Sequence, residues 1–197
     1  MKTKTLAALA PFALLAGCVS LGGGEPPDQL ISLTPAQRAP AGEMGAGKAG
    51  EALVVLDPDT DRRLDVLRVP VQIDGSSIAY VKDAVWVEKP ARQFRRLLAE
   101  TMRAKTGQIV IEGSDFEVTG KTIVSGRLLD MGYDAQDQAV IVRYDAVVTD
   151  GSGTVRSRRF EARVPGIAAE SSQVAPALNS AANDIAQEVA DWLVGGA

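Results

Sequence analysis

The sequence lacks the side chains on which many enzymes and metal proteins depend. It has no histidine and a single cysteine, Cys18, among 197 residues. Histidine is the commonest general base and the commonest transition-metal ligand. Its absence excludes Ser–His and Cys–His nucleophile pairs and zinc sites built from His and Cys. A single cysteine also excludes an internal disulfide.

Basic charge is scarce as well. The chain has 21 Lys and Arg against 25 Asp and Glu, a net charge of −4. With no basic excess to neutralise phosphates, nucleic acid is not the expected partner.

Acidic side chains form no recognisable site in the sequence. Asp57, Asp59 and Asp61 could open a calcium-binding loop. An EF-hand loop needs Gly at its sixth position and an acidic residue at its twelfth, and here these are Arg62 and Arg68. We therefore interpret the segment as a solvated turn. Because no spacing singles out a catalytic pair of carboxylates, we expect no enzyme activity, no cofactor and no metal.

A long hydrophobic run is also missing. The apolar stretch at 6–16 follows a cationic start and is about half the roughly 20 residues needed to span a bilayer. This pattern is typical of a secretory signal peptide. It ends in Leu15-Ala-Gly17-Cys18, which matches a bacterial lipobox. We predict a signal peptide at 1–17, cleavage between Gly17 and Cys18, and diacylglycerol and an N-acyl chain on Cys18. The alternative is an ordinary secretory signal with an incidental cysteine.

The residue after the cysteine bears on location. In lipoproteins of this type an Asp there commonly retains the protein at the inner membrane, whereas this chain has Val19. We therefore expect a lipid anchor in the outer membrane of a Gram-negative bacterium, with the protein facing the periplasm. Removing Lys2 and Lys4 with the signal peptide makes the mature chain more acidic. Membrane attachment would therefore depend on the acyl chains rather than on electrostatic binding of a polybasic segment to anionic lipids.

The residues after the anchor are rich in Gly and Pro. Seven Gly and four Pro fall within 19–50, so we interpret 18–50 as a tether with a reach of roughly 30 Å. Within it, Leu30-Ile-Ser-Leu33 is apolar enough to be an edge strand. From residue 51 to 197 the sequence has the regular apolar patterning of one globular domain.

The body predicts an α/β fold, a mixed and largely antiparallel sheet covered by helices. Pro90 suits the first turn of a helix, and Pro70 suggests that its strand is an edge strand or carries a bulge. Pro176 is expected in the first turn of the last helix or just before it. The expected strands are 52–56, 67–73, 77–81 with 84–87 continuing its extended path, 109–111, 121–131, 139–149 and 154–164, and the expected helices are 90–105 and 172–194.

Four arginines lie on the last predicted strand. They could bind lipid phosphate, or they could mark a charged edge strand that resists aggregation, and we favour the edge strand. The residues are Arg156, Arg158, Arg159 and Arg163.

One segment carries a family resemblance. Residues 78–100 hold a Trp followed by an acidic residue and a Pro, and then a helix with an aromatic residue and Leu positions. This segment resembles the centre of the ABC-type transport auxiliary lipoprotein family, which includes PqiC-like intermembrane transport lipoproteins. Here the Trp–Pro motif is one residue longer than the commoner Trp-Ala-Glu-Pro form. The positions expected to pack within this motif are Trp86, Glu88, Pro90, Phe94, Leu97 and Leu98.

The resemblance implies a fold and a function. The implied fold is a three-layer α/β domain similar to anticodon-binding-like domains. The implied function is that of a non-catalytic subunit of an intermembrane lipid-transport system, with an ABC ATPase, a permease and an MCE-domain protein as partner. The alternative is a structural or assembly lipoprotein of the envelope that supports an outer-membrane barrel or binds peptidoglycan. The sequence leaves open whether the protein forms a homo-oligomer.

Overall fold

The computed structural model describes residues 29–42, 48–113 and 121–195. A 3₁₀ turn at Ala49–Glu51 precedes the regular elements. In chain order these are β1 (Leu53–Leu56), β2 (Asp59–Thr60), β3 (Arg68–Gln72), β4 (Ile78–Val85), α1 (Pro90–Thr106), β5 (Val110–Gly113), β6 (Thr122–Asp134), β7 (Ala139–Asp150), β8 (Val155–Pro165) and α2 (Ser171–Gly195).

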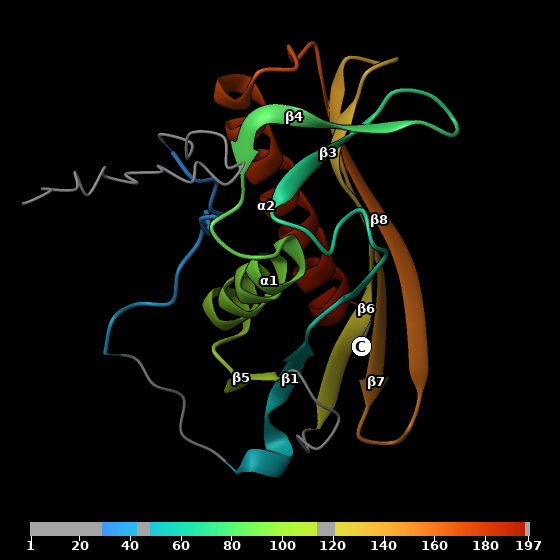
Figure 1. The fold of residues 1–197 in the computed structure, drawn as a ribbon. Coiled ribbons are helices and arrows are strands. Elements are labelled where there is room, and N and C mark those ends of the chain that lie inside the picture. The colour runs from blue at the N-terminus through green and yellow to red at the C-terminus, as the bar shows by residue number, and fades with distance from the viewer. Residues whose placement is uncertain (1–28, 43–47, 114–120, 196–197) are drawn as a thin grey trace, which may run out of the picture.

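The long strand β6 organises the sheet (Figure 1). Along one side it pairs antiparallel with β7, which pairs antiparallel with β8. Along the other side it pairs parallel with β1, β2 and β3. β5 extends the sheet beyond β1 in parallel, and β4 extends it beyond β3 antiparallel. The described residues thus form a mixed eight-stranded sheet with two helices, which confirms the predicted fold class.

Both helices cover the same face of the sheet (Figure 1). The alternation along β7 shows why: Val142 and Tyr144 are buried toward the helices, whereas Arg143 and Asp145 lie partly exposed on the other face. Side chains on a strand alternate between faces, so this pattern indicates one covered face. The described part of the chain therefore has two layers, where the resemblance implied three.

Strand positions differ from the predictions in three respects. β4 is continuous from 78 to 85, so it includes residues 82 and 83 and ends two residues before the end of the extended path expected to reach 87. The two-residue β2 lies within the segment that we interpreted as a turn. β3 is not an edge strand, because it pairs on both sides, but its pairing with β4 shifts between Arg68 and Pro70. The bulge was therefore the correct alternative for Pro70.

The helices begin and end largely as predicted. α1 starts with Pro90 at its first position and ends at Thr106. The next residue, Gly107, has a φ of 62° and donates its N–H to the Arg103 carbonyl at 3.0 Å, which closes the last turn. α2 starts at Ser171, so Pro176 lies inside the helix rather than at or before its first turn. Its missing N–H costs one bond near the helix start. No helix in the described ranges is long and apolar enough to cross a membrane.

Candidate functional site

The segment nearest the predicted anchor is docked on the body. Ile31 forms a parallel bridge with Trp86 at the end of β4. The N–H of Ile31 donates to the Val85 carbonyl at 2.7 Å, and the N–H of Val87 donates to the Ile31 carbonyl at 2.9 Å. Ile31 is only 6% exposed and belongs to the main core. The predicted edge strand at 30–33 is therefore a single bridge, because only Ile31 pairs with β4.

Side chains of α1 hold the next residues of this segment. The Gln93 amide oxygen accepts the N–H of Leu33 at 2.9 Å, and its amide nitrogen donates to the Glu88 carbonyl at 2.7 Å. Farther along, the N–H of Ala39 donates to the carboxylate of Glu100 at 2.9 Å. These bonds replace the pairing that a strand would have provided for an extended backbone.

Two asparagines of α2 hold the same segment from the other helix. The Asn183 side chain accepts the N–H of Ala36 at 2.7 Å and donates to the Thr34 carbonyl at 3.0 Å. The Asn179 side chain accepts the N–H of Thr34 at 2.7 Å. Because Asn183 also donates to the Asn179 carbonyl at 2.8 Å, its amide is fixed in one orientation.

We call residues 31–39 the docked segment. Gln93 and Asn183, at 4% and 7% exposure, are two of the three buried polar side chains in the described ranges. The third, Thr101, bonds within its own helix to the Leu97 carbonyl. The buried amides thus bind the docked segment, which is part of the body rather than a free part of the 18–50 tether. Gly17 and Cys18 lie outside the described residues, and their predicted roles stay predictions.

The aromatic residues of the family motif lie beneath the start of this segment. Trp86 is 1% exposed, and its indole N–H has no hydrogen-bond acceptor among the described residues. Phe94 is fully buried and meets the Tyr144 ring edge-on at 5.1 Å between centroids. Leu97, Leu98 and the ring of Pro90 are also buried. Five of the six motif positions therefore lie in the interior.

Glu88 is the motif position that does not pack in the core. It is partly exposed, and its carboxylate forms ion pairs with Arg92, at 3.5 Å, and with Arg96. The expected packing role for Glu88 is therefore wrong. Basic side chains of α1 hold its carboxylate at the surface, where a charged group stays in contact with solvent.

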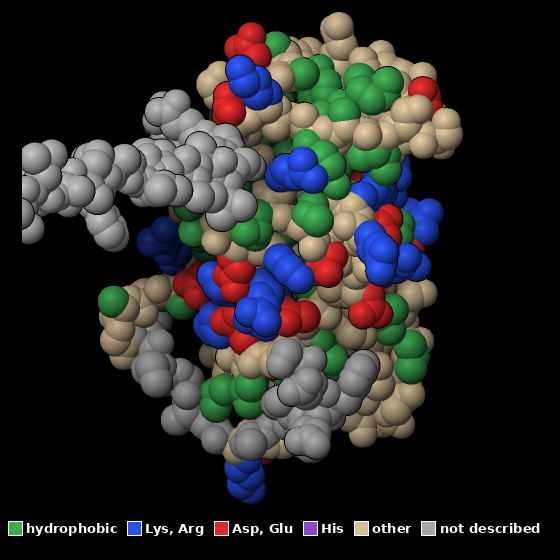
Figure 2. All heavy atoms as spheres, in the orientation of Figure 1, with side chains coloured by type: hydrophobic (Ala, Val, Ile, Leu, Met, Phe, Trp, Pro, Cys, Tyr) green, Lys and Arg blue, Asp and Glu red, His purple; other side chains and the backbone are tan. Residues whose placement is uncertain are grey.

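Mixed charges extend over α1, where Figure 2 shows basic and acidic side chains gathered together. Arg95 contacts Asp57 at 2.7 Å and Glu112 at 3.3 Å. Arg103 contacts Glu112 at 2.8 Å. Arg95 and Arg103 are thus each paired with carboxylates of the neighbouring segments.

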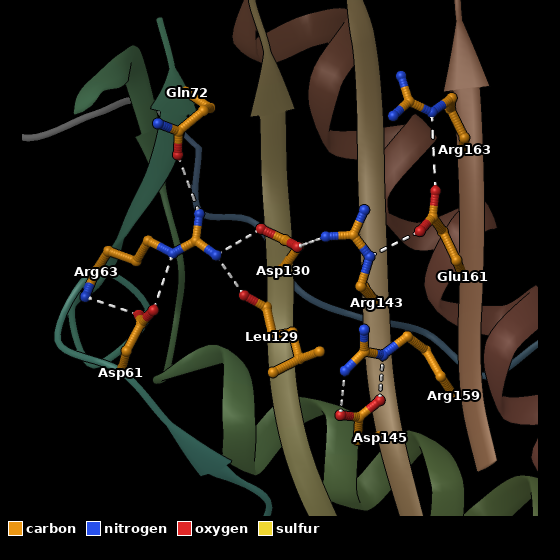
Figure 3. Close-up of polar contacts among 10 residues, drawn as sticks. All are labelled: Asp61, Arg63, Gln72, Leu129, Asp130, Arg143, Asp145, Arg159, Glu161 and Arg163. Atoms are coloured by element: carbon orange, nitrogen blue, oxygen red, sulfur yellow. Dashed lines mark hydrogen bonds and ion pairs between the residues drawn. The ribbon is translucent and has the colours of Figure 1, made fainter. Parts of the chain in front are cut away.

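Two of the four arginines on β8 form ion pairs across the exposed sheet face. Arg159 donates to both carboxylate oxygens of Asp145, at 2.6 and 2.7 Å, and Arg163 contacts Asp137 at 2.5 Å (Figure 3 labels both arginines). The Arg159 guanidinium holds the pKa of the Asp145 carboxyl below its ordinary value.

The other two arginines lie against aromatic rings. Arg158 lies 4.9 Å from the Phe160 ring centre, and Arg156 lies 5.4 Å from that of Trp192. β8 is the outer strand beside β7, so the four residues fit a charged edge strand better than a phosphate site.

A polar network crosses the same face from β3 to β8 (Figure 3). Asp130 accepts from Arg63 at 2.5 Å and also from Arg143, which in turn contacts Glu161 at 2.7 Å. The bond from Arg143 lowers the pKa of Glu161, and the same bond raises the pKa of Arg143. A hollow of about 280 Å³ opens beside Arg63 and Arg143. Arg163 lines it as well, and all three guanidinium groups are already engaged by carboxylates.

The three aspartates considered for calcium do not converge. Asp57 pairs with Arg95 at 2.7 Å, and Asp61 pairs with Arg63 at 3.1 Å. Within the described ranges no group of three or more acidic, His or Cys side chains could hold a metal ion. The arrangement that the structure builds is a binding surface for its own N-terminal segment.

Sequence reasoning missed Gln93, Asn179 and Asn183. A polar residue on an apolar helix face was the available signal, since Asn183 falls between the buried Ala182 and Ile185. The signal identifies a buried amide but not its partner, because the bonded residues are as many as 149 positions apart.

Comparison with known proteins gives one family. The family model for the ABC-type transport auxiliary lipoprotein component matches residues 32–190. No curated protein matches the sequence significantly. The match begins within the docked segment, 19 residues before the expected start of the domain at 51.

Solved structures share the fold at low identity. A Xanthomonas campestris protein of the DUF330 family is 19% identical, with a TM-score of 0.62 over 86% of this chain and 94% of that one. An uncharacterised protein is 11% identical, with a TM-score of 0.63 over 84% and 99%. The PelC dodecamer from Paraburkholderia phytofirmans is more distant, at 14% identity and a TM-score of 0.40 over 73% and 89%.

Proposed function

This chain belongs to the family of ABC-type transport auxiliary lipoprotein components, and we propose that it is the outer-membrane-anchored, non-catalytic subunit of an ABC/MCE intermembrane lipid-transport system. In this role it holds an MCE-domain partner near the membrane. The work is done by binding and positioning rather than by chemistry.

The observation that carries the proposal is the docked segment inside the family match. The family model covers 159 residues from 32 to 190, so it includes residues 32–39 of the docked segment. Gln93 and Asn183 bond that segment to both helices. Because this segment follows the predicted anchor, its docking keeps the body close to the membrane. A role that depends on position at the membrane fits this arrangement.

The composition supports a non-catalytic role. The chain has no His, and its lone Cys lies in the lipobox. On the described sheet face the carboxylates of Asp130, Asp145 and Glu161 are each bonded to arginine. The bonds to arginine lower the pKa of Asp145 and of Glu161, and a carboxyl group with a lowered pKa is a poor general acid or base at neutral pH.

Anchoring also supports a function in binding. Confining two proteins to one narrow compartment raises their effective concentration, so a modest intrinsic affinity is enough for a complex. We expect the full chain to contact the co-encoded MCE-domain protein weakly in solution and stably on the membrane.

In-cell crosslinking tests the proposal. Wild-type protein and Cys18→Ala are compared for crosslinks to the co-encoded MCE protein, with membrane fractionation and intact mass measured alongside. We expect wild-type protein to carry acyl mass, to fractionate with outer-membrane markers and to crosslink more than Cys18→Ala. Equal crosslinking of both would remove the role of the anchor. No crosslink from either would remove the partner, and fractionation with inner-membrane markers would contradict the location.

A further inference from the structure

Three exposed apolar side chains surround the point where the docked segment leaves the body. Leu30, Leu67 and Val87 are 53%, 45% and 51% exposed, and we call them the exit patch. Backbone bonds bring their chain segments side by side. The N–H of Val87 donates to the Ile31 carbonyl at 2.9 Å, and the N–H of Trp86 donates to the Leu67 carbonyl at 2.7 Å.

The local backbone explains why these residues face outward. Ile31 and Trp86 form the bridge and are buried, at 6% and 1% exposure. Neighbours in an extended chain point to opposite faces, so Leu30 and Val87 turn away from the core. A single exposed apolar residue is ordinary, but several gathered at one place mark an interaction surface.

Charged side chains beside the exit patch are mostly basic. Lys89 pairs with Asp65 at 2.6 Å, and Glu88 pairs with Arg92 and Arg96. Arg68, next to Leu67, lies over the Tyr80 ring. These neighbours comprise four basic side chains, Arg68, Lys89, Arg92 and Arg96, against two acidic ones, Asp65 and Glu88. Among the described residues these neighbours therefore carry two more basic than acidic side chains, on a chain whose net charge is −4.

Chain length places this patch close to the anchor. Leu30 lies twelve positions after Cys18, and a fully extended chain of that length spans at most about 40 Å. Because residues 31–39 are bonded to both helices, only the residues before Ile31 separate the body from the predicted anchor in the sequence.

We infer that the exit patch rests on the lipid surface that holds the Cys18 acyl chains, with its apolar side chains among the lipids and its basic rim on anionic headgroups. An apolar centre with Lys and Arg around it is the arrangement that suits a membrane interface. The inference rests on the proposed function, since it needs the Cys18 anchor.

Spin labelling of the lipidated full chain tests the inference. Cys18 is the lone cysteine, and lipidation consumes its thiol, so Val87→Cys gives one labelling position. The matched control is Val155→Cys at the start of β8, where the native side chain is 61% exposed. Each labelled protein is reconstituted into phosphatidylethanolamine–phosphatidylglycerol vesicles, and flotation is measured first. Collision with oxygen and with a water-soluble nickel complex is then measured at both positions.

We expect position 87 to lose its collisions with the nickel complex and gain collisions with oxygen, whereas position 155 keeps the aqueous pattern. An aqueous pattern at both positions in floating vesicles would overturn the inference and leave the anchor intact. If position 87 loses its collisions with the nickel complex only after an MCE-domain protein is added, the inference is overturned in favour of a protein partner. Lipid exposure at both positions would also overturn it. Failure to float would overturn the anchor, and the inference with it.

Discussion

At the scale of single residues, the buried amides and the docked segment depend on each other. An amide in a core is costly unless it is bonded, and an extended segment off the sheet has unpaired backbone groups. Asn183 and Gln93 satisfy both needs at once. This explains why polar side chains occupy positions that a helix packed on a sheet would otherwise fill with apolar ones.

Asn183→Ala should release part of the docked segment. It leaves the Ala36 N–H and the Thr34 carbonyl without their partner. We expect the free energy of unfolding to fall by about 1–3 kcal/mol, with faster protease cleavage within 31–39. Urea unfolding and mass-resolved proteolysis measure both effects. The control is Asp184→Ala, at an exposed neighbour on α2, and an equal loss in the two variants would contradict a specific role for Asn183.

Trp86 should contribute through packing. We expect Trp86→Ala to lower the free energy of unfolding by about 3–5 kcal/mol, because it removes a buried aromatic side chain. Trp86→Phe should cost less, since it keeps a ring and removes the indole N–H that has no acceptor among the described residues. Thermal melts of both variants are compared with Val87→Ala at an exposed position. Unchanged melting of Trp86→Ala would show that the side chain serves a surface contact instead.

At the scale of elements, the close approach of β6 and β7 depends on Gly126. Its φ is +152°, and an added Cβ would lie 2.0 Å from the Asp145 carbonyl oxygen and 2.8 Å from the Tyr144 hydroxyl. The Tyr144 hydroxyl donates to the Ser125 carbonyl at 2.8 Å beside it. Burial raises the pKa of Tyr144 well above its ordinary value, so this hydroxyl stays a donor.

Gly126→Ala should therefore separate the two strands locally. Because the obstructing atom belongs to the backbone, it cannot move aside as a flexible side chain could. We expect a loss of at least about 2–3 kcal/mol in the free energy of unfolding. Gly75→Ala, where an added Cβ meets no atom within 4 Å, should be nearly neutral in the same denaturant titration. Similar stability of the two variants would rule out the steric constraint at β6.

At the scale of the whole molecule, stability should respond to acid but not to pH near neutrality. No His is present to titrate, so we expect a nearly constant free energy of unfolding between about pH 5.5 and 8. Arginines hold the pKa of Asp145 below 3.8 and that of Glu161 below 4.5. Groups with a lowered native pKa stabilise the fold above their unfolded pKa, and this stabilisation is lost as pH falls through the native pKa.

Urea unfolding measured from acid to neutral pH checks this prediction. Stability should begin to fall below about pH 4.5, where the unfolded chain starts to bind more protons than the native one. Asp145→Asn should reduce the slope of the decline, and Asp184→Asn, at an exposed position on α2, should leave it unchanged. An unchanged slope in Asp145→Asn would show that the ion pair between Asp145 and Arg159 does not contribute to the pH dependence of stability.

The chain's local patterns predicted most of its elements. Alternation along 139–149 identified β7, and Pro90 marked the start of α1. The lipobox, the missing His and the motif around Trp86 are also properties of the sequence alone. They are local because periodicity, capping residues and short motifs are determined by neighbours in the chain.

Only the tertiary structure decided which distant groups meet. The Gly- and Pro-rich composition of 18–50 favoured a free tether, but Asn183 bonds Thr34 across 149 positions and holds residues 31–39 on the body. Tertiary packing also decided three other features. These are the placement of both helices on one sheet face, the ion pairs of Glu88, and the joint exposure of Leu30, Leu67 and Val87. Each depends on packing between segments far apart in sequence, where burial and hydrogen bonding outweigh local propensity.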